Sequence, residues 1–88
     1  MRIIEGFRLR TVMGQATIVG EGVGQIDFNK LITLNESAAY LWQSVENKDF
    51  DASYLATLLI DKYGIDSETA SKDADAIAKK WIEVGVIG

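Results

Sequence analysis

The pattern of hydrophobic and polar positions along the chain changes character near Asn35. Between Phe7 and Val12 apolar and polar positions alternate, Gly14 interrupts the pattern, and residues 17–19 form a short β-branched run. Alternation with a period of two is typical of a strand with one buried face, and β-branched residues favour strands. Two such runs around a glycine predict a β-hairpin.

A third strand is expected from about Ile26 to Leu34, after a glycine-rich connection at residues 20–24. Successive side chains of a strand point to opposite faces of the sheet. The expected faces therefore hold Phe28, Ile32 and Leu34 on one side, and Leu31 and Thr33 on the other.

After Asn35 the apolar positions recur at helical spacing, and three helices are predicted. Asn35, Asp51 and Asp66 can each begin a helix, because their side-chain oxygens accept an otherwise unpaired backbone N–H. Gly64 and Gly85 can end the second and third helices in the left-handed conformation. The faces that these helices would bury are Ala38, Leu41, Trp42 and Val45; Leu55, Leu58, Leu59 and Tyr63; and Ala70, Ala74, Ile77, Trp81 and Val84.

Three strands followed by three helices predict an α+β domain, because a doubly wound sheet would alternate the two kinds of element. The 88 residues fit one domain spanning residues 1–88. In a three-stranded sheet two strands are edges, and an edge offers unpaired N–H and C=O groups to another extended chain. The third strand is therefore a candidate for peptide binding by strand addition.

Composition narrows the chemistry, because the chain contains neither cysteine nor histidine. Thiolate metal sites, a cysteine nucleophile and the usual general base at neutral pH are therefore excluded. The acidic side chains Asp51 and Asp66 have a simpler use as helix caps, and no carboxylate pair lies in an apolar run that would raise its pKa. We predict a protein that is not an enzyme and needs no cofactor or metal.

The net charge of −4 is unevenly distributed. Residues 1–30 carry four basic and three acidic side chains, and residues 31–88 carry five lysines and ten carboxylates. The charge of the first segment is thus +1 and that of the second is −5, which argues against a nucleic-acid partner for the helices. The N-terminus does not resemble a signal peptide and no run reaches the length of a membrane span, so a cytoplasmic protein is expected.

Residues 34–42, LNESAAYLW, resemble the LNxxAxxLW signature of the PqqD family. Further similarities follow in register: the acidic start of the last helix at residues 66–73, the large apolar Trp81, the ending at residues 84–87 and the hairpin sequence at residues 7–10. Each motif alone has low specificity. Together they occur in the order and spacing of the family and cover nearly the whole chain.

The resemblance implies a winged-helix-like fold and a function as recognition element for ribosomally made, modified peptides. The leader of a precursor peptide would add as a strand to the third strand, beside the third helix. The domain would then deliver that peptide to a radical S-adenosylmethionine enzyme or another modifying enzyme. For this chain, the resemblance implies the following peptide-binding residues: Asn29, Lys30, Leu31, Ile32, Thr33, Asp73, Ala76, Ile77 and Lys80.

Two alternatives to leader binding come from the same elements. A homo-oligomer would form if the third strand paired with a second copy of itself. A DNA-binding winged helix would use the third helix, but residues 66–83 carry three lysines against five carboxylates. The substitution Ile32→Pro is expected to weaken peptide binding on condition that the amide of Ile32 faces the open edge.

Overall fold

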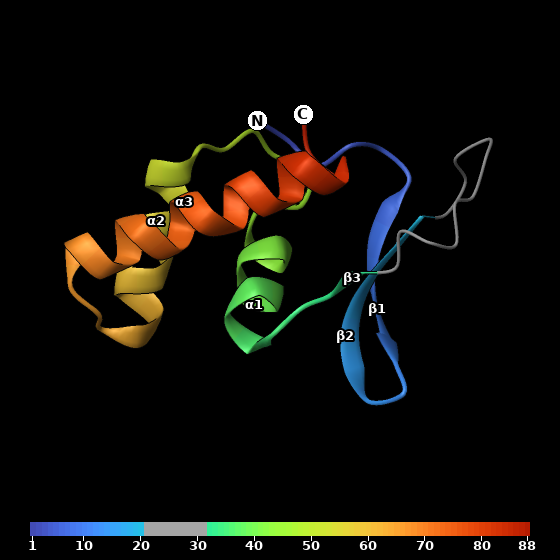
Figure 1. Cartoon of the computed structure of the whole chain (residues 1–88), viewed down its shortest axis with the longest axis horizontal. Helices are drawn as coiled ribbons and strands as arrows, with labels where there is room; N and C mark the ends of the chain where they lie inside the picture. The colour runs from blue at the N-terminus through green and yellow to red at the C-terminus, as the bar shows by residue number, and fades with distance from the viewer. Residues whose placement is uncertain (21–31) are drawn as a thin grey trace.

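A computed structural model describes residues 1–20 and 32–88, which form a three-stranded antiparallel sheet followed by three helices (Figure 1). The strands are β1 (Phe7–Val12), β2 (Gln15–Gly20) and β3 (Ile32–Thr33), and they lie in the order β1-β2-β3. The α+β prediction is confirmed. The predicted connection after Gly20 and the part of the third strand before Ile32 lie outside the described residues.

The hairpin of β1 and β2 turns at two residues, Met13 and Gly14, between the facing pair Val12 and Gln15. Their φ angles of 53° and 80° are both positive, which is the conformation of a type I′ turn. This turn fits the right-handed twist of the two strands and therefore sets the register of the hairpin. The hairpin was predicted, although β2 is longer than the expected residues 17–19.

The helices are α1 (Glu36–Ser44), α2 (Ala52–Tyr63) and α3 (Ser67–Val84), and they lie to one side of the sheet in Figure 1. The three predicted caps are confirmed. The side-chain Oδ1 of Asn35 accepts the N–H of Ala38 at 2.9 Å, and Asp51 accepts that of Tyr54 at 2.8 Å. None of the described helices is long and apolar enough to cross a membrane.

The end of α3 returns the chain to the core. Gly85 has a φ of 82° and ends the helix as predicted, because this left-handed conformation suits a residue without Cβ. Val86 and Ile87 are buried, and Ile3 forms an antiparallel bridge with Ile87. The first and last residues of the chain therefore lie side by side, as Figure 1 shows.

The core is centred on two tryptophans, one from α1 and one from α3. Trp42 and Trp81 meet edge to face with ring centroids 5.3 Å apart, and Phe50 meets Trp81 in the same way at 6.5 Å. This geometry places the positive edge of one ring against the negative face of the other. The buried Nε1 of Trp42 has no hydrogen-bond partner among the described residues.

The predicted buried faces need three changes. Tyr63 is 40% exposed, because it lies at the end of α2 and contacts the ring of Tyr40 from α1, with centroids 6.2 Å apart. Ala56 and Ala78 were not placed in the core but are buried. Both belong to the α2 and α3 pair, which packs closely and needs small side chains where two helices approach.

Candidate functional site

Strand β3 is an edge of the sheet within the described residues, since it pairs with β2 alone. The pairing is antiparallel, with Ile32 facing Ile18 and Thr33 facing Thr17. The next residue continues the ladder, because the N–H of Leu34 donates to the carbonyl of Ala16 at 2.8 Å. The side of β3 away from β2 is therefore the open side of the sheet.

The rungs of this ladder fix which backbone groups face outward. In an antiparallel pair, hydrogen-bonded and non-bonded residue pairs alternate along the strands. Because Leu34 bonds to Ala16, the next bonded pair is Ile32 with Ile18, and Thr33 lies between them. The N–H and C=O of Thr33 therefore point away from β2 toward the open side.

This register decides whether a substitution of Ile32 can test peptide binding at the open edge. The amide of Ile32 faces β2, so the condition attached to the Ile32→Pro prediction is not met. Proline at this position would remove a bond that holds β3 in the sheet, rather than a bond to an added strand. Thr33 is the described residue whose amide tests the open edge.

The side chains of the segment alternate as predicted. Leu34 is buried and Ile32 is half-buried against the core, whereas Thr33 is exposed. Asn29, Lys30 and Leu31, and also Phe28, lie outside the described residues. The structure thus describes two of the five predicted binding residues of this strand.

The four predicted residues of α3 lie on one flank of the helix. This flank contains Asp73, Ile77 and Lys80, which are spaced four and three residues apart. Ala76 lies beside Ile77 on the same side of the helix. Ile77 is half-buried and packs against the core, and the other three are exposed. Among the described residues, no hydrogen bond or ion pair joins this flank to β3.

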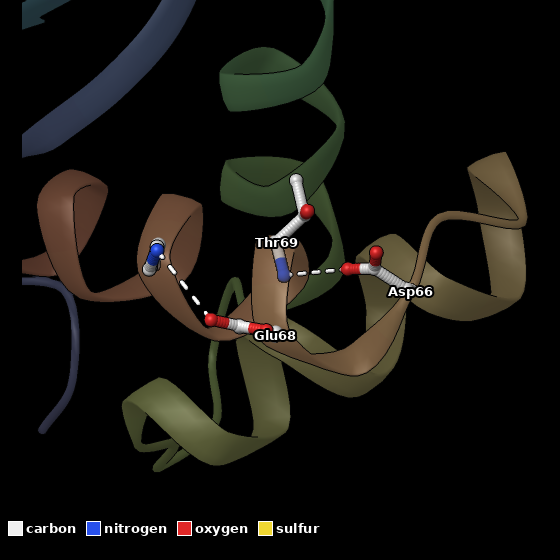
Figure 2. Close-up of polar contacts among 4 residues, drawn as sticks. Asp66, Glu68 and Thr69 are labelled. Carbon is white, nitrogen blue, oxygen red and sulfur yellow. Dashed lines mark hydrogen bonds and ion pairs between the residues drawn. The ribbon is translucent and has the colours of Figure 1, made fainter.

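The start of α3 is acidic and makes two local polar contacts, which Figure 2 shows. The N–H of Thr69 donates to Oδ1 of Asp66 at 2.7 Å, and this hydrogen bond lowers the pKa of Asp66 below its ordinary value of 3.8. Glu68 lies 3.6 Å from the Nζ of Lys72, one turn along the helix. Both side chains of that ion pair are exposed, so the pair adds little stability.

A groove that the sequence did not predict lies at the opposite edge of the sheet. It has a volume of about 740 Å³ and is lined by residues 2–10 and 46–48. Four of its side chains are basic: Arg2, Arg8, Arg10 and Lys48. The excess of arginine in the first part of the chain was the signal for it, but the approach of residues 46–48 to β1 depends on the tertiary fold.

The part of the chain that the structure describes contains no cluster of side chains that could hold a metal ion. No group of three or more acidic side chains there lies close enough to hold an ion. The described residues form three surfaces that a partner could contact: an open strand edge at β3, an exposed flank of α3 and a basic groove at β1.

The chain is similar to a known protein family and to a solved structure. The family described as coenzyme PQQ synthesis protein D (PqqD) matches residues 13–87. The structure described as "TbiB1 in Complex with the TbiA(beta) Leader Peptide" shares the fold, with a TM-score of 0.73 and 11% sequence identity. The alignment covers 99% of this chain and 94% of that chain. No curated protein matches the chain.

The family match includes β2, the described part of β3, the three helices and the residues that close the core. It also contains the segment at residues 34–42 that carries the sequence signature. Because the match extends over most of the chain and agrees with the observed order of strands and helices, the chain belongs to the PqqD family.

Proposed function

We propose that this protein is a binding module that captures the leader of a ribosomally made precursor peptide as an added strand on β3. Membership of the PqqD family supports this function. The similar structure of TbiB1, which is a complex with a leader peptide, supports it as well. In the chain itself, the observation that carries the proposal is the open edge at Thr33.

Backbone hydrogen bonds would supply much of the affinity. Thr33 offers one N–H and one C=O to an antiparallel or parallel partner, and each hydrogen bond contributes about 0.5–1.5 kcal/mol net. Asn29, Lys30 and Leu31, which precede Thr33 in the sequence, are proposed to belong to the same binding site. Because the backbone forms the bonds, the edge accepts different leader sequences, and side-chain contacts must select among them.

Selectivity is assigned to the exposed flank of α3. Ala76 is small and lets a leader side chain approach the helix, while Ile77 offers partly exposed apolar surface beside it. Asp73 and Lys80 carry opposite charges seven residues apart, which is two turns of helix. A leader with an acidic residue near Lys80 and a basic residue near Asp73 would therefore bind in a defined direction.

The captured peptide would be presented to a peptide-modifying enzyme, and we propose a radical S-adenosylmethionine enzyme for this role. The protein itself would be non-catalytic and cytoplasmic, and residues 1–88 would form its single peptide-recognition domain. The lack of histidine and cysteine supports the absence of catalysis, because the commonest bases and nucleophiles are missing.

The experiment that tests this function is calorimetric titration with the peptides encoded by short reading frames beside the gene. One of them is expected to bind with a 1:1 stoichiometry, and its leader alone should retain the affinity. If the isolated leader does not bind, whereas the remaining core of the same peptide does, leader recognition is wrong.

Self-association is the second candidate, because an open strand edge also accepts another copy of the same strand. Sedimentation velocity over a hundredfold range of protein concentration separates the two. A monomer that binds the leader supports the module. A dimer that dissociates when Thr33 is replaced by proline would support strand pairing between copies.

A further inference from the structure

Among residues 1–20 and 32–88, the outer edge of β1 is a second open edge, and its orientation follows from the hairpin. In a hairpin with a two-residue turn, the flanking pair Val12 and Gln15 is hydrogen-bonded, so bonded pairs recur at Arg10 and Arg8. The backbone groups of Leu9 and Thr11 therefore point away from β2. The two strand pairings are consistent with each other. The backbone groups of successive β2 residues then bond alternately to β1 and to β3.

This edge forms one side of the groove at residues 2–10 and 46–48. One wall is held in place by the C-terminal residues. The N–H of Arg2 donates to the carbonyl of Gly88 at 2.9 Å, and that of Ile4 donates to Val86 at 2.9 Å. The opposite wall is the turn after α1, which contains Lys48. Backbone hydrogen bonds within the chain therefore hold one wall of the groove in position.

The charge of the groove is opposite to that of the protein. Its lining has four basic side chains and two acidic ones, Glu5 and Glu46, whereas the whole chain has a net charge of −4. Lys48 is held near the ring of Tyr54, with its Nζ 5.8 Å from the ring centroid. Such a local excess of positive charge attracts an acidic partner and accelerates its association.

We propose that this groove binds an acidic, extended segment of a protein partner other than the leader peptide. The inference rests on the proposed function at one point only, the assignment of the leader to β3. Because β2 separates the two edges, both peptides can bind at the same time. The exposed backbone groups of Leu9 and Thr11 favour a polypeptide, because an extended chain matches their spacing and a nucleic acid does not.

A second copy of this protein fits the groove less well. Five of the acidic side chains of the chain belong to the α3 region, at Asp66, Glu68, Asp73, Asp75 and Glu83. These residues lie in α3 or at its cap, and a helical backbone cannot add as a strand to an open edge. The acidic residues of the α3 region therefore do not supply an extended segment for this groove.

The test is an NMR titration of the ¹⁵N-labelled full chain with a capped peptide that repeats Glu-Val four times. The amides of Leu9, Thr11 and Lys48 are expected to shift, and that of Thr33 is not. Peptides that repeat Lys-Val or Glu-Pro four times are the controls. The first reverses the charge, and the second keeps the charge but lacks half of the N–H groups. Equal binding of either control peptide would overturn the proposal.

Two charge reversals complete the test. Lys48→Glu should weaken binding of the Glu-Val peptide roughly threefold to tenfold, because an exposed charge pair contributes modestly and reversal adds repulsion. Lys79→Glu makes the same change on the exposed face of α3 and should leave the affinity within twofold. Equal weakening by both variants would show that only the net charge matters.

Two further measurements separate other occupants. An eight-nucleotide oligothymidine that shifts the same amides with equal affinity would overturn a polypeptide partner. Groove amides that shift with protein concentration alone would identify a second copy of this chain and also contradict the proposal. Because Leu9 and Thr11 report this groove and Thr33 reports the leader, either proposal can fail while the other stands.

Discussion

The two edges of the sheet differ in how they are built. The β1 edge belongs to a six-residue strand, which a two-residue turn joins to β2 and which forms part of a basic groove. The β3 edge has two described residues and leads directly into the cap of α1. Edge exposure alone therefore does not identify a leader site. The surroundings of each edge decide what kind of chain it can accept.

The largest expected effect comes from removing the support that both edges share. Ile18 is fully buried in β2, between the two edges. Ile18→Ala should lower the free energy of unfolding by about 2–5 kcal/mol, because it removes buried methyl groups and leaves a cavity. Urea unfolding followed by tryptophan fluorescence measures this change. A loss below about 0.5 kcal/mol would contradict the burial of Ile18.

A pair of proline substitutions separates support from binding at β3. Ile32→Pro removes a bond to β2 and should destabilise the fold by about 1–3 kcal/mol. Thr33→Pro removes the outward N–H and should reduce leader affinity about tenfold, with a smaller effect on stability. Thermal unfolding and calorimetric titration of both variants provide the comparison. The reverse pattern would mean that the register of β3 is wrong.

A substitution in the connection from β3 to α1 should lower the free energy of unfolding by an intermediate amount. The side chain of Asn35 accepts the N–H of Ala38, and Asn35→Ala removes this cap. The expected cost is about 1 kcal/mol in the free energy of unfolding. Asn35→Asp is the matched control, since aspartate also caps and should retain most of the stability. Equal losses in both variants would show that capping is not what Asn35 contributes.

A smaller effect is expected from charge on the flank of α3. Lys80→Glu should change the affinity for a charged leader by about twofold to fivefold, in the direction set by the leader charge. Lys79→Glu is the control one position away on the helix. A salt titration checks the cause, because screening should remove the difference between the two variants. No difference at low salt would place the leader away from Lys80.

The pH dependence of stability should include a contribution from Asp66. The folded-state pKa of this group lies below its ordinary value of 3.8, so its charged form stabilises the folded state. This contribution is complete above pH 3.8 and is lost as pH falls through the folded pKa. Asp66→Asn should therefore flatten the decline of stability in acid, as urea unfolding between pH 2 and pH 5 would measure. An unchanged decline would contradict the role of the cap hydrogen bond.

The helices were predictable because their ends depend on local chemistry. Asn35, Asp51 and Asp66 cap the helices as expected, and Gly64 and Gly85 end two of them in the left-handed conformation. A cap requires a side chain within three residues of the amide that it bonds. Such signals are present in any short window of the sequence, so no tertiary information was needed.

The groove at β1 and the exposure of Tyr63 were not predictable in the same way. Residues 46–48 and β1 are far apart in the sequence, and only the packing of α1 beside the sheet brings them together. Tyr63 continues the apolar spacing of α2 but contacts Tyr40 at the surface, because the helix ends there. The open direction at Thr33 also required the register, which hydrophobic pattern alone does not specify.

The central claim, that the leader adds to β3 and not to β1, is tested most directly by amide hydrogen exchange. The leader-bound and free proteins would be compared by NMR at single residues. The account predicts slower exchange at Thr33 when the leader binds, with no change at Leu9 or Thr11. Slower exchange at Leu9 and Thr11 with none at Thr33 would place the leader in the groove at β1 and contradict the account.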